Sequence, residues 1–459
     1  MLPDSAEALS AAYASRKLSP VEYTRACLAR IDVWEPKLNA MYQLDREGAL
    51  EQARAAEARW RSGAPRSPLD GVPITIKENI YTRGDPAPIG TRANEDLPPQ
   101  ADDAPAAARV REAGCVLLGK TTMPDFGMLA SGLSSKHGTT RNPWDLKRNS
   151  AGSSSGAGAA LVAGYGPLAL GTDIGGSVRL PAAYNGVFAL KPSLGRVPIY
   201  PPFLGRVVGP MTRTVTDAAL LMAELSKPDA RDYMALPAQD IDWTGSLKGG
   251  VKGKRLGLML DSVGLKTQPA VRRAITEAAK AFANAGALIE PVAPFFTREM
   301  LSGLDVFFQA RLLAEYQRLP AGRQAKVLPF IAKWCRRAQT LSAVEAARAL
   351  LQVFQLREQA VAAIQKFDFL LSPTSPITAY AVGEATPGND PQRPFEHIGF
   401  TAPFNMSEQP ACSICAGYDA DGLPIGLQIV GHRFDDAGVL RMARAYETMR
   451  PKLRPWPQP

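Results

Sequence analysis

The sequence contains Asn149-Ser-Ala-Gly-Ser-Ser-Ser-Gly156 and, after a short apolar segment, Gly171-Thr-Asp-Ile-Gly-Gly-Ser-Val-Arg179. Upstream of both lies Gly71-Val-Pro-Ile-Thr-Ile-Lys77, whose apolar and β-branched residues predict a short buried strand that ends at a lysine. Residues 121–158 are rich in Gly, Ser, Asn and Pro and predict a long loop region, the kind of segment that often carries function. The candidate functional region therefore lies within residues 71–179.

The serines and the lysine of these segments suit nucleophilic catalysis. A serine hydroxyl is a weak nucleophile until a base takes its proton, and the chain has three histidines, so a lysine is a natural candidate for that base. Lys77 must be neutral to act, and burial at the end of an apolar strand lowers the pKa of an amine. Gly175 and Gly176 allow a sharp turn that points backbone amides at a developing oxyanion beside Ser177. Each feature alone fits an ordinary turn or a surface lysine, but their joint occurrence with Ser153 favours a catalytic site.

Predicted strands and helices alternate along the chain, which favours an α/β sheet. Residues 5–60 are Ala-rich with helical spacing, and residues 227–252 are polar and loop-like. A strand–helix–strand unit is predicted over 255–292, and residues 299–366 are nearly all helical in pattern. The other predicted strands are Cys115–Leu118, Leu168–Leu170, Phe369–Leu371, Cys412–Cys415 and Pro424–Val430, and the other predicted helices are Asp102–Ala113, Ala159–Ala163 and one that Thr216 and Asp217 cap.

The chain resembles the amidase signature family of serine hydrolases over residues 69–213, almost without interruption. The resemblance resumes weakly at Leu371-Ser-Pro-Thr374 and clearly at Gly422-Leu-Pro-Ile-Gly-Leu-Gln428. It implies one large α/β domain over residues 1–459, with a mixed central β-sheet flanked by α-helices. Besides the three segments quoted above, the motifs that carry it are Lys120-Thr-Thr-Met-Pro-Asp-Phe126, Arg141-Asn-Pro-Trp144, Gly186-Val-Phe-Ala-Leu-Lys-Pro-Ser-Leu-Gly195 and Gly209-Pro-Met-Thr-Arg213.

The resemblance divides this domain into four parts. Residues 1–60 are expected to be N-terminal helices, and residues 69–213 to form the catalytic signature core. The mostly helical residues 227–366 are expected to shape the substrate pocket, and residues 367–459 to return to the sheet. Because residues 227–366 diverge from the family, the substrate that this pocket accepts stays open.

The family's Ser–cis-Ser–Lys triad maps onto Ser177 as the nucleophile, Ser153 as the serine after a cis peptide bond, and Lys77 as the base. Ser154 is an alternative to Ser153, but Ser153 keeps the family's spacing to Ser177 without a gap. As a bridge that relays the proton, Ser153 Oγ is expected to lie within hydrogen-bonding reach of both Lys77 and Ser177. The resemblance also implies an oxyanion hole and three supporting polar residues, which are Ile174, Gly175 and Gly176 for the hole and Ser154, Asp173 and Arg179 for the support.

The activity that the resemblance implies is hydrolysis of the C–N bond of an amide, anilide or carbamate through an acyl-enzyme on Ser177, without a metal or organic cofactor. A urethanase or an esterase of the same family stays open, as does the family's glutaminase subunit of tRNA-dependent amidotransferases. The expected partner is a small-molecule amide or carbamate rather than nucleic acid or a membrane, and the expected assembly is a monomer or a homodimer. Five apolar residues are candidates for an acyl pocket but fit core packing as well: Phe126, Met128, Leu129, Phe307 and Phe308.

Two short patterns point to other classes of protein. Gly114-Cys-Val-Leu-Leu-Gly-Lys-Thr121 matches the phosphate-binding loop of NTP-binding proteins, but its interior is apolar where that loop needs a flexible backbone. Residues 152–156 match the nucleophile elbow of α/β-hydrolases, in which Ser154 would be the nucleophile, but no hydrophobic strand precedes them. The histidines that this elbow would need fit loop or surface positions better than a catalytic base: His137, His397 and His432.

Cysteine spacing and composition argue against several further classes. Cys412 and Cys415 could suggest redox or metal chemistry, but their segment alternates like a strand and no second Cys pair or His cluster completes a zinc site. The 459 residues carry five cysteines, which suits a reducing compartment. The net charge is +9, but the basic residues are spread along the chain, which argues against nucleic-acid binding. The N-terminal segment lacks the basic start and Leu-rich core of a secretory signal, and no stretch of about 20 apolar residues exists, so we expect a cytoplasmic protein.

Overall fold

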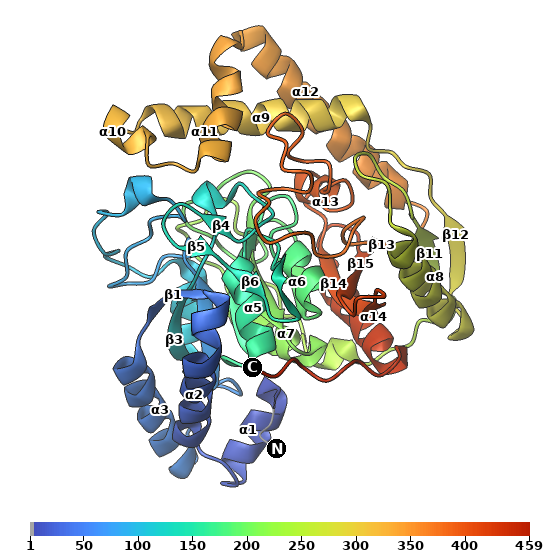
Figure 1. The fold of residues 1–459 in the computed structure, drawn as a ribbon. Coiled ribbons are helices and arrows are strands. Elements are labelled where there is room, and N and C mark those ends of the chain that lie inside the picture. The colour runs from blue at the N-terminus through green and yellow to red at the C-terminus, as the bar shows by residue number, and fades with distance from the viewer. Residues whose placement is uncertain (1–3) are drawn as a thin grey trace.

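A mixed sheet of eleven strands forms the centre of the structure, a computed structural model that describes residues 4–459 (Figure 1). The strands are β1 (Met41–Leu44), β2 (Pro73–Lys77), β3 (Val116–Thr121), β8 (Leu168–Asp173), β9 (Phe188–Lys191), β10 (Val207–Thr212), β11 (Arg255–Leu258), β12 (Leu288–Pro291), β13 (Phe369–Pro373), β14 (Ala411–Tyr418) and β15 (Pro424–Val430). Their order across the sheet is β1-β3-β2-β8-β10-β9-β14-β15-β13-β11-β12, so the two halves of the chain meet where β9 pairs with β14. The predicted single α/β domain with a mixed sheet is confirmed.

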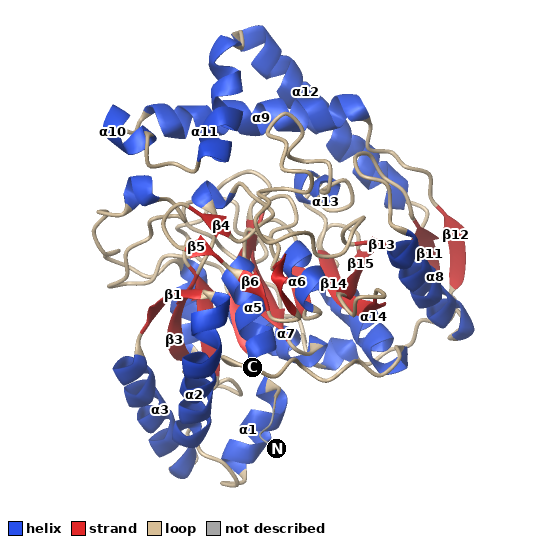
Figure 2. Ribbon diagram, viewed as in Figure 1, coloured by secondary structure: helices blue, strands red, loops and turns tan. Residues whose placement is uncertain are grey.

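Helices surround this sheet (Figure 2). The N-terminal helices α1 to α3 lie at the bottom of the view, and α9 to α12 form a layer at its top. Within the described residues, no helix is both long and apolar enough to cross a membrane. The helices are α1 (Ala6–Ala14), α2 (Pro20–Leu38), α3 (Arg46–Arg61), α4 (Pro105–Glu112), α5 (Ser155–Ala163), α6 (Arg179–Asn185), α7 (Val215–Leu225), α8 (Pro269–Asn284), α9 (Arg298–Gln317), α10 (Ala321–Gln324), α11 (Pro329–Arg336), α12 (Ala343–Ile364), α13 (Ala402–Met406) and α14 (Asp436–Met449).

The N-terminal part needs one correction, because residues 1–60 are not helices alone. After α2 the chain turns at Asn39, whose φ of 52° is left-handed, and continues into β1. This strand pairs antiparallel with β3 at the edge of the sheet, with Met41 opposite Thr121. Of the four residues of β1, Met41 alone is buried. The strand therefore lacks the alternation of buried and exposed residues that identifies a half-buried strand in a sequence.

The site-bearing part of the sheet consists of the parallel strands β3, β2 and β8. Helix α4 lies between β2 and β3 in the chain, and α5 precedes β8. Because parallel strands point the same way, the carboxyl ends of β2 and β8 lie at one edge of the sheet. That edge brings Lys77 close to Thr172 and Asp173, at the start of the predicted glycine-rich turn.

The structure contradicts the phosphate-loop alternative. Gly119 and Lys120 lie within β3, so the apolar residues between the two glycines form a buried strand rather than a loop. The amine of Lys120 is buried and donates to the carbonyl of Ile80 at 2.5 Å and to Thr82 Oγ1 at 2.8 Å. It is therefore occupied within the core instead of being available to a nucleotide.

The predicted loop region 121–158 contains four short strands that are not part of the main sheet, and α5 begins near its end. The strands are β4 (Leu133–Ser134), β5 (Gly138–Thr139), β6 (Arg141–Asn142) and β7 (Asp145–Asn149). Part of this region packs with α6, α9, α11 and α12 in one hydrophobic cluster.

Cys412 and Cys415 are buried, unpaired residues of β14, as predicted. The predicted unit β11–α8–β12, with parallel strands, and the helical segment 299–366 are confirmed as well.

Candidate active site

Lys77 and Ser153 are in direct contact. Lys77 ends β2, and the parallel pairing of β2 with β8 places its side chain beside Thr172. The Nζ of Lys77 donates hydrogen bonds to Ser153 Oγ at 2.8 Å and to Thr172 Oγ1 at 2.9 Å. The exposed fractions of Lys77 and Ser153 are 0% and 3%. The fold thus joins the lysine and the serine of two distant motifs in a buried hydrogen bond.

Burial lowers the pKa of the Lys77 amine to about 7. Removal of the amine from water disfavours its charged form, and this outweighs the opposite influence of the Asp173 and Glu78 carboxylates. A large fraction of Lys77 is therefore neutral near pH 7. A neutral amine is what a proton acceptor requires.

Three buried lysines with a lowered pKa should make the protein more stable as the pH rises from 7 to 8.5. Burial lowers the pKa of Lys77, Lys120 and Lys191 to about 7 from the value of 10.5 of an exposed lysine. In this pH window the unfolded chain therefore binds more protons than the folded one, and each proton taken up on unfolding raises the free energy of unfolding by about 1.4 kcal/mol per pH unit. Chemical denaturation at the two pH values measures the difference. Lys120→Met should reduce the rise, and a free energy of unfolding that is lower at pH 8.5 than at pH 7 would contradict the expectation.

The three consecutive serines differ in their contacts. The peptide bond between Gly152 and Ser153 is cis, as the resemblance implies. Ser154 Oγ donates to the carbonyl of Thr172 at 3.2 Å, and Ser155 Oγ donates to the carbonyl of Ser131 at 3.0 Å. Among the three, Ser153 is the residue that contacts Lys77, which agrees with the spacing chosen from the sequence. Its catalytic role stays a prediction.

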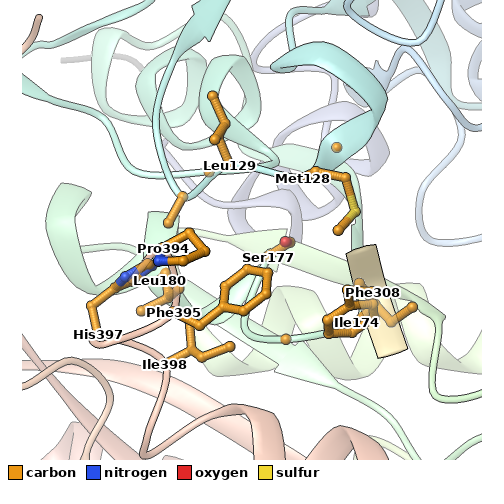
Figure 3. Close-up of a pocket in the computed structure, with 14 residues that line it drawn as sticks. Met128, Leu129, Ile174, Ser177, Leu180, Phe308, Pro394, Phe395, His397 and Ile398 are labelled. Atoms are coloured by element: carbon orange, nitrogen blue, oxygen red, sulfur yellow. The ribbon is translucent and has the colours of Figure 1, made fainter. Parts of the chain in front are cut away.

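Ser177 lies just before α6, is partly exposed and lines a cavity (Figure 3). Its carbonyl accepts a hydrogen bond of 3.1 Å from the amide of Ser154, which ties the two serine-containing segments together. Within residues 4–459, no hydrogen bond joins the hydroxyls of Ser177 and Ser153. The expected contact of Ser153 with both partners is therefore formed on the lysine side alone. Catalytic hydrogen bonds of this kind are often long before a substrate binds.

Asp173 and Arg179 form a buried ion pair behind this turn. Arg179 donates to both carboxylate oxygens of Asp173, from Nε and from Nη2, at 3.0 Å each. Burial alone would raise the pKa of Asp173, but the charge and hydrogen bonds of Arg179 outweigh it and hold that pKa well below its usual range. Arg179 also donates to Gln428 Oε1 at 2.8 Å and to Asn405 Oδ1 at 2.6 Å. Both charges are thus fully partnered, which fits the supporting role predicted for the pair.

The predicted oxyanion hole needs a correction at Gly176. The amide of Gly176 donates to Asp173 Oδ1 at 2.8 Å, so it holds the turn instead of pointing at a substrate. Gly176 has a φ of +126°, and a Cβ there would lie 2.6 Å from Thr401 Oγ1, so this turn requires glycine. Ile174 and Gly175, in contrast, line the cavity together with Ser177 and remain candidate donors.

The cavity beside Ser177 is small and largely apolar, with a volume of about 40 Å³. Of the five apolar pocket candidates, Met128, Leu129 and Phe308 line it. Phe126 and Phe307 do not line it and pack against the neighbouring hydrophobic cluster instead. The described lining includes no Asp, Glu, Lys or Arg; its other members are Gly127, Ala130, Gly152, Ile174, Gly175, Leu180, Pro394, Phe395, His397 and Ile398.

The histidines give no support to the nucleophile elbow. His137 Nε2 bonds to Glu78 Oε2 at 2.9 Å, and His432 Nε2 bonds to the carbonyl of Phe367 at 2.8 Å. His397 lies in a loop, as predicted, but it is buried in the cavity wall and is not a surface residue. Since Ser154 Oγ donates to a backbone carbonyl, no histidine activates it in this structure.

Sequence analysis missed several residues of the site. Thr172 contacts Lys77 and also accepts a hydrogen bond of 3.1 Å from Asn79 Nδ2. Thr172 lies within one of the quoted motifs and Asn79 just after another, so their positions in the sequence could have identified them as site residues. Phe395 and His397 come from a loop far along the chain, and nothing in the local sequence marks that loop as part of the site.

The fold is that of known amidase structures. A bacterial aryl acylamidase of the amidase signature family superimposes with a TM-score of 0.90 at 30% identity, covering 98% of this chain and 96% of that one. The peptide amidase of Stenotrophomonas maltophilia superimposes with a TM-score of 0.84 at 27% identity, covering 98% of each chain. The family described as Amidase matches residues 22–440, and the chain belongs to it. Among curated proteins, the chain is 37% identical over 467 residues to a glutamyl-tRNA(Gln) amidotransferase subunit of Myxococcus xanthus (strain DK1622), with 96% of each chain covered.

Proposed function

We propose that the protein hydrolyses the C–N bond of a small amide, anilide or carbamate through an acyl-enzyme on Ser177. The observation that carries this proposal is the buried hydrogen bond of 2.8 Å from Lys77 Nζ to Ser153 Oγ. A lysine whose pKa burial lowers to about 7 can accept a proton, and a serine beside it can pass one on. Ser177 is partly exposed and lines a cavity whose described walls carry no Asp, Glu, Lys or Arg, which suits an apolar acyl group.

The proposed reaction has two halves. Ser177 Oγ attacks the carbonyl carbon, its proton passes through Ser153 to Lys77, and the amides of Ile174 and Gly175 stabilise the oxyanion. The proton then returns to the leaving nitrogen, the C–N bond breaks, and an amine departs from the acyl-enzyme. In the second half, water gives its proton through Ser153 to Lys77 and attacks the acyl carbon. The bond from that carbon to Ser177 Oγ then breaks, and the proton returns to Ser177. The product is a carboxylic acid or, from a carbamate, a carbonate monoester.

The curated relatives favour a second candidate, the glutaminase subunit of an amidotransferase. The amidotransferase subunit of Myxococcus xanthus covers nearly the whole chain at 37% identity, above the 30% of the aryl acylamidase. Glutamine, however, carries an ammonium and a carboxylate, and charges are buried at low cost only with charged or well-oriented polar partners. Since the cavity beside Ser177 lacks Asp, Glu, Lys and Arg, the geometry supports a less polar substrate better.

A side-by-side assay distinguishes the two candidates. The purified full chain is offered 4-nitroanilides, primary amides, aryl carbamates and L-glutamine, and the release of amine or ammonia is followed. Hydrolysis of anilides or carbamates with a kcat/KM well above that for glutamine supports the main proposal. The opposite order would assign the chain to the glutaminase function.

Ser153→Ala should lower kcat by about 10²-fold or more while the protein stays folded. If Ser153 only lined a turn, its loss would cost about 1 kcal/mol of stability and little rate. If Ser153 relays the proton, its loss removes a general acid–base contribution to kcat of at least ~10²-fold. Steady-state kinetics together with thermal denaturation separate the two cases. A rate within a few-fold of the wild type would rule out the relay.

A further inference from the structure

One buried imidazole in the cavity wall has no partner within the protein. His397 lines the cavity together with Ser177, and its exposed fraction is 2%. Neither Nδ1 nor Nε2 forms a hydrogen bond with any of residues 4–459. The other two histidines are bonded, to Glu78 and to a backbone carbonyl. A buried polar group without a partner costs stability, so its retention needs a reason.

His397 is a polar residue in an otherwise apolar part of the cavity wall. The remaining side chains of the cavity wall are apolar apart from Ser177, and Figure 3 shows them gathered around that serine. Burial lowers the pKa of His397 to about 4, against the opposing charge of Glu396, so the ring is neutral at pH 7. A neutral imidazole offers one N–H donor and one nitrogen acceptor. His397 can thus form a hydrogen bond with an uncharged group that enters the cavity.

We propose that His397 is a specificity-determining residue, which hydrogen-bonds to a polar atom in the acyl part of the substrate, one or two bonds from the scissile carbonyl. This inference rests on the proposed function. The cavity volume of about 40 Å³ is a few times the ~10–15 Å³ that a cavity needs to hold one water molecule, so the group that fills it is short. The matching substrates are alkoxycarbonyl compounds, which are carbamates, and α-alkoxy or α-hydroxy amides.

The placement of the other groups assigns this contact to the acyl side. Ser177, which stays bonded to the acyl group, lines the cavity with Ile174 and Gly175, the candidate donors to its oxygen. Lys77 and Ser153, from which the leaving nitrogen receives its proton, do not line it. The portion of substrate beside His397 is therefore the portion that remains on Ser177 after the amine departs.

Three 4-nitroanilides of equal length test the proposal, because they share a leaving group and differ in one atom. Butyryl 4-nitroanilide has no oxygen in the acyl chain, ethyl N-(4-nitrophenyl)carbamate has one next to the carbonyl, and methoxyacetyl 4-nitroanilide has one a bond further. The kcat/KM of each is measured for the wild type, His397→Phe and His397→Gln. Phe395→Leu serves as a matched control, since it reshapes the same wall without changing its polarity.

His397→Phe should lower kcat/KM about tenfold or more for at least one oxygen-bearing substrate relative to butyryl 4-nitroanilide, the size expected for one lost hydrogen bond. His397→Gln, which keeps a donor and an acceptor, should restore part of that preference, and Phe395→Leu should change all three substrates in parallel. Removal of the unpartnered ring nitrogens should also leave the melting temperature of His397→Phe equal to or above that of the wild type.

Two results would overturn the inference. One is an unchanged substrate ratio in both His397 variants, and the other is a loss of stability in His397→Phe with all substrates affected equally, which would make His397 a packing residue. The proposed function is tested separately in the same assay. If the wild type turns over the anilides and Ser177→Ala does not, the function holds even where the His397 ratio fails.

Discussion

Ser177→Ala is expected to abolish hydrolysis, with a fall in kcat of at least ~10⁴-fold, as for the loss of other serine nucleophiles. The substitution removes the atom that we propose attacks the carbonyl, and it leaves the backbone amides of the turn in place. Because Ser177 is partly exposed and its hydroxyl forms no hydrogen bond with Ser153, the free energy of unfolding should change by less than ~0.5 kcal/mol. Steady-state kinetics and denaturation of the same preparation check both statements.

A trapping experiment makes this prediction specific to Ser177. A slowly turned-over 4-nitrophenyl carbamate should add its acyl mass to the wild type, on the peptide that contains Ser177, and add nothing to Ser177→Ala. Activity that survived in Ser177→Ala but was lost in Ser154→Ala would instead assign the nucleophile to the elbow pattern of residues 152–156.

Lys77→Met should lower kcat by about 10³-fold, within the range of general acid–base contributions. The substitution keeps an unbranched side chain of similar length but removes the amine that we propose accepts the proton from Ser153. In the wild type, kcat/KM should rise with pH through about 7 and then level off, because burial lowers the pKa of Lys77 to about 7 and only the neutral amine accepts a proton. pH–rate profiles from pH 5.5 to 9 measure this.

Lys120→Met is the matched control for Lys77→Met. Lys120 is equally buried, on the neighbouring strand, and burial lowers its pKa to about 7 as well. Its amine, however, donates to Ile80 and Thr82 rather than to a serine of the site. We expect Lys120→Met to change stability and leave the rate within a few-fold of the wild type. Equal rate losses in the two variants, or a wild-type rate that falls with rising pH, would reject Lys77 as the base.

The local sequence contained enough information to place the main elements of the site. The apolar run before Lys77 is a buried strand, and the glycine-rich segment before Ser177 is a tight turn. The resemblance to the amidase signature family, which the order of the motifs carries, implied the fold. The family's spacing between the two serines favoured Ser153 over Ser154, which agrees with the contact of Ser153 with Lys77. These features depend on neighbouring residues and on residue type, both of which a sequence displays directly.

Other features were decided by tertiary structure alone. β1 forms because its backbone finds a partner in β3, although its four residues show no alternation. The Gly176 amide is taken by Asp173, and nothing in the motif tells which of several consecutive amides a nearby carboxylate will bind. Phe308 enters the cavity while its neighbour Phe307 does not, because adjacent positions of α9 face different directions.

His397 shows most clearly the difference between what the sequence determined and what the tertiary structure decided. The sequence determined that the chain has the serines, the lysine and the fold of an amidase, since these follow from local motifs in a fixed order. The burial of His397 beside Ser177 follows from the docking of the loop of Pro394–Ile398 onto the cavity wall, which no local pattern encodes. Chain segments far apart in sequence meet only when the sheet closes and its side chains pack, and it is that packing that places His397 and Ser177 in one cavity wall.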